Sequence, residues 1–173
     1  MNTEMSKGDG LRRYLFTFFA TWLCWLLLTA SLDPQELFAG LLVSGVITLL
    51  AASHLGILSG IRWSRELPMA VVRFIGVFLV ALFKANLDMA RRVLSPSLPI
   101  EPAMVEVRTS LKSDLGKLLL ANSITLTPGT LTLDVIDDRL LVHWVDSTPG
   151  TDLESATHEI VSRFETHLRG FLH

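Results

Sequence analysis

Charged residues are scarce in the first third of this chain. Only 18% of its 173 residues are charged, and 50% are hydrophobic. Residues 14–32 contain no charged side chain, and residues 37–61 contain none apart from the titratable His54. Each stretch has the roughly 20 apolar residues that a helix needs to cross a membrane. The pattern excludes an entirely soluble protein and predicts two membrane spans, about 14–32 and 37–61.

The same lack of charge limits what the two spans can do. Ionisable side chains inside a membrane relay protons or bind cations. Neither predicted span contains Asp, Glu, Lys or Arg, and His54 lies toward one end of the second span. We therefore expect that this chain alone neither conducts nor exchanges ions.

Cysteine is nearly absent, since Cys24 is the only one. A single cysteine excludes an intrachain disulfide and a cysteine-only zinc site. The histidines lack the spacing of metal ligands, and we expect His143 to be either a sheet-surface or a half-buried residue of a strand. The net charge of −2 gives no sign of nucleic-acid binding. We expect no catalytic residue, metal, cofactor or nucleic acid, and no small-molecule substrate bound by this chain alone.

Four carboxylates accompany a predicted hairpin in the second half of the chain. Asp137 and Asp138 are typical turn residues. A weaker alternative is that they crowd with Asp134 and Asp146 near one end of the hairpin and attract a cation.

Basic residues flank the two spans asymmetrically. Arg12 and Arg13 precede the first span, and Arg62 and Arg65 follow the second. The connecting segment 33–36 carries two acids and no base. By the positive-inside rule, both outer ends are cytoplasmic and the short connection lies outside.

Small residues recur every fourth position along the second span. Such a row lets a neighbouring helix backbone approach closely. The partner is either the first span or another chain. The row consists of Gly40, Ser44, Thr48, Ala52 and Gly56.

Residues 68–94 predict an amphipathic helix. The uninterrupted apolar run, 74–83, is too short to span a membrane. A helical projection places the charged residues within about 60° of one another and an apolar set opposite. We favour a helix lying in the membrane surface; the alternative is a third span with its polar stripe against other subunits. The charged set is Arg73, Lys84, Asp88 and Arg91, and the apolar set is Phe78, Leu82, Ala85, Met89 and Val93.

The pattern after residue 94 is typical of a small soluble domain preceded by a linker. Residues 95–102 contain three prolines and predict an extended linker. Residues 103–173 then predict the order β-α-β-β-α, an α+β sandwich with two helices on one face of a three-stranded sheet. Either Ser110 or Ser113 caps the first helix, and Thr151 with Glu154 forms a capping box for the second.

The run 118–130 joins a helix to a strand. Pro128 keeps Thr127 extended, and Gly129 adopts backbone angles closed to other residues. The segment holds no nucleophile, metal ligand set or phosphate-binding loop, so we expect a structural or subunit-contact role. Its members are Asn122, Thr125, Thr127, Pro128, Gly129 and Thr130.

The residues of this run and of the following hairpin resemble the E subunit of Mrp-type (Mnh or Pha) multisubunit cation/proton antiporters. The resemblance is carried by LLANSITLTPGTLTLDV at 119–135 and RLLVHWVD at 139–146. One departure is the polar stretch 1–13, which is longer than the family usually shows.

The resemblance implies an accessory subunit of a bacterial plasma-membrane complex that exchanges cytoplasmic Na⁺ for external H⁺. The ion paths would lie in larger subunits. The expected partners are other membrane subunits and membrane lipid, and the soluble domain would be cytoplasmic. Two alternatives remain: the equivalent subunit of a hydrogenase-type membrane complex, and a stand-alone membrane-anchored module that recruits a soluble partner.

Overall fold

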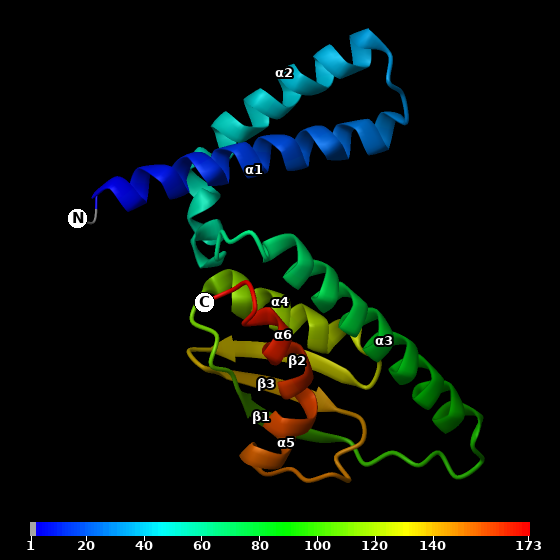
Figure 1. The fold of residues 1–173 in the computed structure, drawn as a ribbon. Helices are drawn as coiled ribbons and strands as arrows, with labels where there is room; N and C mark the ends of the chain where they lie inside the picture. Colours follow the sequence, from blue (N-terminus) through cyan, green and yellow to red (C-terminus); the bar gives the residue numbers. More distant parts are fainter. Residues whose placement is uncertain (1–2) are drawn as a thin grey trace. The chain divides into compact units, whose positions relative to one another are not determined.

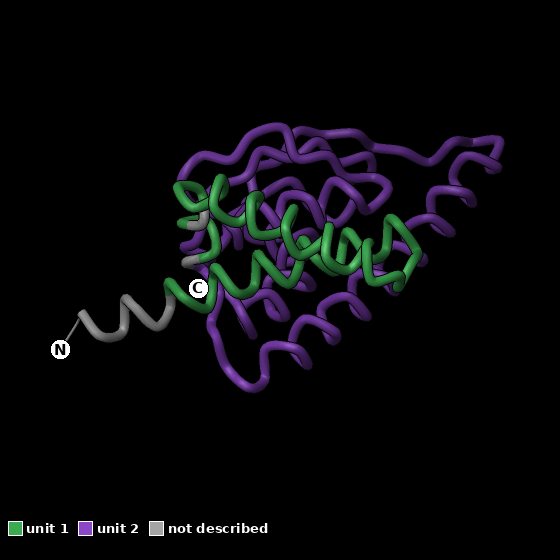
Figure 2. Tube along the Cα trace, turned by 90° about the horizontal axis from the view of Figure 1, so that it is seen from above, with its two compact units in different colours: residues 1–59 green, residues 60–173 purple. Residues whose placement is uncertain are grey.

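The computed structural model describes the backbone of residues 3–173 and the side chains of 10–54, 56–58 and 60–173. The chain divides into two compact units, Met1–Ser59 and Gly60–His173 (Figure 2).

The first unit is a pair of packed helices. Helix α1 covers Thr3–Thr29 and α2 covers Pro34–Leu50. A short connection separates them, and Ala30 takes a positive φ of 49° there. Pro34 begins α2 in the first helical turn, where its missing N–H costs no hydrogen bond. Segments Gly10–Thr29 and Pro34–His54 are long and apolar enough to cross a membrane.

The helix bounds differ from the predicted ones at all four ends, and α2 begins at Pro34 rather than Leu37. Helix α1 begins at Thr3, within the polar stretch, and ends at Thr29 rather than Leu32. Helix α2 ends at Leu50, and the 3₁₀ helix η1 occupies Ala51–Gly60. The predicted second span, 37–61, is therefore not one continuous α-helix. Ser53, Gly56 and Gly60 explain the change, because serine and glycine are poorer α-helix formers than the preceding leucines.

The second unit contains an antiparallel sheet. Strands β1 (Ala103–Arg108), β2 (Thr130–Ile136) and β3 (Arg139–Trp144) are ordered β1-β3-β2. Alternate residues of β1 and β3 are buried, as the apolar pattern predicts. Helices α4 (Asp114–Leu126), α5 (Leu153–Ile160) and α6 (Ser162–Leu168) cover that face (Figure 1). The inward strand residues are Val105, Val107, Leu140, Val142 and Trp144.

Two predicted details of this domain are wrong. The last helix is not continuous, because it breaks at Val161 into α5 and α6. The break lets α5 pack on β1 while α6 contacts α4. The N-cap of α5 is Asp152 rather than Thr151. The Asp152 carboxylate accepts hydrogen bonds from the backbone N–H groups of Glu154 (3.1 Å) and Ser155 (3.0 Å). A carboxylate at this position also complements the helix dipole.

Helix α3, Leu67–Leu94, belongs to the same compact unit as the sheet. It packs along α6 on the side of the helical layer (Figure 1). Phe74 meets Phe171 with ring centroids 6.0 Å apart, and Phe78 meets Phe164 at 6.3 Å. Ala81 is only 2% exposed. The amphipathic segment therefore shares the hydrophobic core of the small domain.

The segment between α3 and β1 forms no helix, in agreement with its proline content. It is nevertheless fixed near its C-terminal end, at Pro99 and Glu101. The Arg92 guanidinium donates to the Pro99 carbonyl oxygen (2.7 Å). Glu101 forms a parallel bridge with Asp146, and its backbone N–H donates to Val145 O (3.0 Å). These bonds hold the segment against the domain.

Candidate functional site

The joint between α4 and β2 is built by local sequence rules. Ser113 caps the start of α4, because its Oγ accepts from the Gly116 N–H (3.2 Å). The helix ends at Leu126, one residue before the extended Thr127. Gly129 has a φ of +99°, a conformation that favours glycine, and the chain reverses there into β2.

Threonine hydroxyls form hydrogen bonds with backbone groups at and just after the end of α4. Thr127 Oγ1 donates to the Ser123 carbonyl (2.8 Å), and Thr130 Oγ1 donates to the Ile124 carbonyl (2.6 Å). Thr125 Oγ1 accepts from the Thr132 N–H (3.1 Å). The first two bonds cap carbonyls of the last turn of α4, and the third satisfies the Thr132 N–H at the start of β2. Asn122, by contrast, is exposed on α4.

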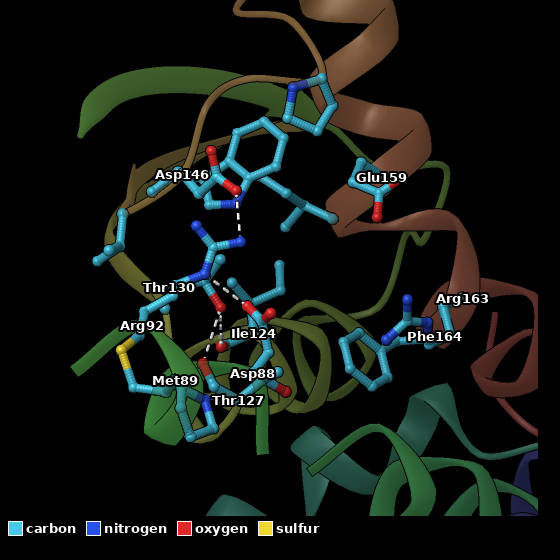
Figure 3. Close-up of a pocket in the computed structure, with 16 residues that line it drawn as sticks. Asp88, Met89, Arg92, Ile124, Thr127, Thr130, Asp146, Glu159, Arg163 and Phe164 are labelled. Atoms are coloured by element: carbon cyan, nitrogen blue, oxygen red, sulfur yellow. Dashed lines mark hydrogen bonds and ion pairs between the residues drawn. The ribbon is translucent and has the colours of Figure 1, made fainter. Parts of the chain in front are cut away.

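A cavity of about 200 Å³ lies beside the joint (Figure 3). Residues 127–130 form one wall, and Asp88, Met89 and Arg92 of α3 form another. The end of β3 and the facing parts of α5 and α6 complete it. The sequence motif is therefore adjacent to the carboxyl end of α3, a contact that the sequence pattern did not indicate. Its remaining lining includes Trp144, Asp146, Glu159, Arg163 and Phe164.

Arg92 is the central polar residue of this cavity (Figure 3). Its guanidinium contacts the Asp88 carboxylate at 2.7 Å and the Asp146 carboxylate at 2.6 Å. The side chains of Arg92 and Asp146 are only 20% and 24% exposed. This ion pair ties the last turn of α3 to the chain after β3. Sequence reasoning missed it, because nothing in the spacing of Arg92 and Asp146 connects the two positions.

The hydrogen bonds around Asp146 lower the pKa of its carboxyl group. The Thr148 hydroxyl contributes most, followed by the Thr148 backbone N–H and the Arg92 guanidinium. All three favour the ionised carboxylate over the neutral acid. Asp146 is therefore fixed as an anion that holds Arg92.

The hairpin carboxylates do not form a cation site. Asp137 and Asp138 make the turn that precedes β3, whereas Asp146 follows its other end. Asp138 instead faces Arg108, with 3.6 Å between the carboxylate oxygen and Nε. Among the described residues, no group of His, Cys, Asp and Glu is arranged to hold a metal ion. The weaker alternative, in which all four acids crowd at one end, is wrong because β3 separates Asp146 from the other three.

The small-residue row of α2 faces α1 over part of its length. Gly40, Ser44 and Thr48 are buried. A Cβ at Gly40 would lie 2.6 Å from Cδ1 of Trp25, so only glycine fits there. Ala52 and Gly56 fall in η1, where Gly56 is exposed and a Cβ on it would meet nothing within 4 Å.

Helix α3 presents a second apolar face away from the domain. Phe83 is 65% exposed and Leu94 is 83% exposed. Phe78 and Met89, predicted on the single apolar face, instead contact the domain core and the joint. The helix therefore has two apolar faces with the charged stripe at one border between them. The outward set is Met69, Val72, Ile75, Leu79, Val80, Phe83, Leu87, Val93 and Leu94.

Comparisons with known proteins agree on one family. Residues 18–170 match the family described as Na⁺/H⁺ ion antiporter subunit. The E1 subunit of the Na⁺/H⁺ antiporter of Staphylococcus saprophyticus is 37% identical over 134 residues, which cover 76% of this chain and 81% of that protein. The E1 subunit from a Staphylococcus aureus strain is 42% identical over 88 residues, covering 49% of this chain and 55% of that protein.

A solved structure is also similar. It is a chain of the membrane-bound sulfane sulfur reductase, an archaeal respiratory membrane complex. The two chains are 44% identical with a TM-score of 0.79, and the match covers 91% of this chain and 97% of the other. The apolar helices and the small antiparallel domain thus occur together in a chain of a membrane complex.

Proposed function

The chain belongs to the E-subunit family of Mrp-type Na⁺/H⁺ antiporters, and on that premise we propose that it is an accessory, non-conducting subunit of a multisubunit antiporter in a bacterial plasma membrane. One observation carries the non-conducting role. The interiors of the two spans, 14–29 and 37–50, contain no Asp, Glu, Lys or Arg. A helix pair without such residues has no ionisable side chain that could relay a proton or bind a sodium ion within the membrane.

Exposed apolar surface supports a role in assembly. Phe38, Leu42 and Leu49 of α2 are exposed in the hairpin, and Met104 and Leu131 are exposed on the sheet face opposite the helices. Apolar patches on a sheet face commonly mark interaction sites. We propose that the hairpin contacts lipid and neighbouring membrane subunits, and that the open sheet face and Asn122 contact a subunit near the membrane.

Deletion of the chain tests the accessory role. Everted vesicles from the deletion strain should lose Na⁺-driven collapse of the pH gradient, and the complex should run smaller or be missing on a native gel. Re-expression of the chain is the control. Full antiport by a normally assembled complex without this chain would refute the proposal.

We further propose that the C-terminal domain lies in the cytoplasm. Arg12, Arg13, Arg62 and Arg65 flank the spans, while Asp33 in the loop and Glu36 in the first turn of α2 make the connection between the spans acidic. This distribution supports a cytoplasmic position for both outer ends.

Single cysteines in a Cys24→Ser background test this orientation. In intact cells a membrane-impermeant maleimide should label Gln35→Cys and leave Thr166→Cys unlabelled, since both positions are exposed. Both should react after lysis. Labelling of Thr166→Cys in intact cells would place the domain outside.

We also propose that α3 lies in the plane of the membrane surface. With 28 residues, α3 is about 42 Å long. Its length and composition would also suit a membrane span. However, it is attached to the soluble domain near both ends, through Phe74 against Phe171 and through Arg92 against Asp146. A spanning α3 would draw the polar surfaces of α5 and α6 into hydrocarbon, at a large desolvation cost. An in-plane helix places its outer apolar face in lipid and its inner face on the domain.

A second candidate function follows from the similar solved structure. The same chain architecture occurs in an archaeal respiratory membrane complex at 44% identity. We propose that the alternative host is a respiratory membrane complex with antiporter-like subunits. Affinity purification of the tagged chain distinguishes the two host complexes. Co-purification of antiporter subunits alone would support the antiporter, whereas co-purification of redox subunits would support the respiratory complex.

The stand-alone binding module makes a different prediction. Such a chain should purify as a monomer in detergent with one soluble partner. Co-purification of several membrane proteins in fixed proportion would exclude it.

A further inference from the structure

A second groove lies along the flank of α3. It has a volume of about 270 Å³ and an apolar floor from four residues on successive turns of α3, with Lys84 and Arg163 beside it. Lys84 belongs to α3 and Arg163 to α6, so two separately placed elements bring two cations to one groove. The floor residues are Gly76, Val77, Val80 and Ala81.

Neither cation is neutralised by a partner. Within the described part of the chain, no ion pair is formed by Lys84 or Arg163. Asp88 lies one turn after Lys84 on α3, and Glu159 lies four residues before Arg163, across the break at Val161; neither acid lines the groove. Asp88 is already held by Arg92 at 2.7 Å. The groove therefore presents net positive charge next to apolar side chains.

The groove adjoins the outer apolar face of α3. Val80 is a member of both, and Leu79 and Phe83 follow on the exposed side. Gly76 widens the groove, because a Cβ at that position would meet nothing within 4 Å. A ligand that fits this arrangement carries an anionic group for the two cations and a hydrocarbon chain for the apolar floor.

We propose that this groove binds the phosphate of an anionic membrane phospholipid, with one acyl chain directed along Val80 toward the outer face of α3. The proposal rests on the in-plane position of α3 described above, because only that position brings Lys84 and Arg163 to the level of lipid headgroups. Basic side chains at this level are attracted to anionic lipid. Bound lipid would fix α3, and with it the joint after α4, at a defined height in the complex.

Native mass spectrometry of the purified full chain in detergent tests the site. The chain is titrated with phosphatidylglycerol or with phosphatidylcholine, and apparent affinities are compared. We expect preferential binding of phosphatidylglycerol, and a loss of about tenfold in the Lys84→Gln/Arg163→Gln variant. The matched control is Lys112→Gln/Arg169→Gln, which removes the same charge from two exposed residues outside the groove.

Three outcomes would overturn the proposal. The first is no preference for phosphatidylglycerol in the wild-type chain. The second is an equal loss in the groove variant and the control, which would indicate diffuse charge. The third is displacement of the lipid by millimolar inorganic phosphate, which would assign the cations to a soluble anion.

A separate readout distinguishes failure of the site from failure of the α3 placement. A fluorophore at Phe83→Cys, in the Cys24→Ser background, reports contact with brominated lipid. Quenching without a phosphatidylglycerol preference would overturn the lipid site and leave the in-plane helix standing. Absence of quenching would overturn both.

Discussion

The two compact units differ in the size of the side chains that each buries in its own interior. The α1–α2 hairpin buries Gly40, Ser44 and Thr48, while many of its large apolar residues are exposed. The small domain buries large side chains such as Leu120, Leu140 and Phe164. Burial of apolar area stabilises the domain in water, whereas close helix approach stabilises the hairpin in lipid. We therefore expect substitutions that remove side-chain volume to destabilise the domain, and substitutions that add side-chain volume to destabilise the hairpin.

The largest effect is expected in the domain core. Phe164 is 3% exposed and packs against Phe78 of α3. Phe164→Ala should lower the free energy of unfolding by about 3–5 kcal/mol, because it leaves a cavity between α6 and α3. Thermal unfolding of the full chain in detergent measures this. Leu118→Ala, at an exposed position of α4, is the control, and an equal loss there would contradict the assigned core.

Added volume in the hairpin should have the next largest effect. Gly40→Val places new atoms against Trp25, whose Cδ1 is 2.6 Å from the position of the Cβ. We expect a loss of about 2 kcal/mol in helix packing and weaker assembly on a native gel, with unchanged unfolding of the small domain. A Cβ at Gly45 would meet nothing within 4 Å, so Gly45→Val is the control. Normal assembly of Gly40→Val would show that the α1–α2 contact does not limit assembly.

The Arg92–Asp146 pair should have a moderate, pH-dependent effect. Asp146→Asn should cost about 1–2 kcal/mol. The pKa of Asp146 is lowered in the folded state, so its contribution is present above the unfolded value of about 3.9. It should be lost as the pH falls through the folded pKa.

The melting temperature should therefore fall below about pH 4 more steeply in the wild type than in Asp146→Asn. The control is Asp138→Asn, which removes a half-exposed pair and should cost less than about 0.5 kcal/mol. Identical pH profiles for the wild type and Asp146→Asn would contradict the assignment.

The smallest effect is expected at the joint. Thr130→Val removes the hydroxyl that donates to the Ile124 carbonyl at 2.6 Å. Loss of this bond should cost about 0.5–1.5 kcal/mol of domain stability. A large loss of assembly with unchanged domain unfolding would indicate that Thr130 contacts another subunit instead.

Local rules predicted much of the domain and little of its packing. Alternation in β1 and β3 and the reversal at Gly129 depend on near neighbours in the chain and agree with the structure. The cap of α4 was predicted at either Ser110 or Ser113, and it is Ser113. The break at Val161 depends on docking of α5 to β1, which periodicity does not reveal. Likewise, hydropathy cannot tell whether Phe78 faces protein or lipid, because both environments are apolar.

The depth of α3 tests the central claim most directly. Fluorophores on single cysteines at Met69, Leu79, Phe83 and Leu94, all exposed on the outer face, are quenched by lipids brominated at different depths. An in-plane helix predicts the same shallow depth at all four positions, while Thr166→Cys in the domain stays unquenched. A depth that changes steadily from Met69 through the bilayer centre to Leu94 would contradict the account and make α3 a third span.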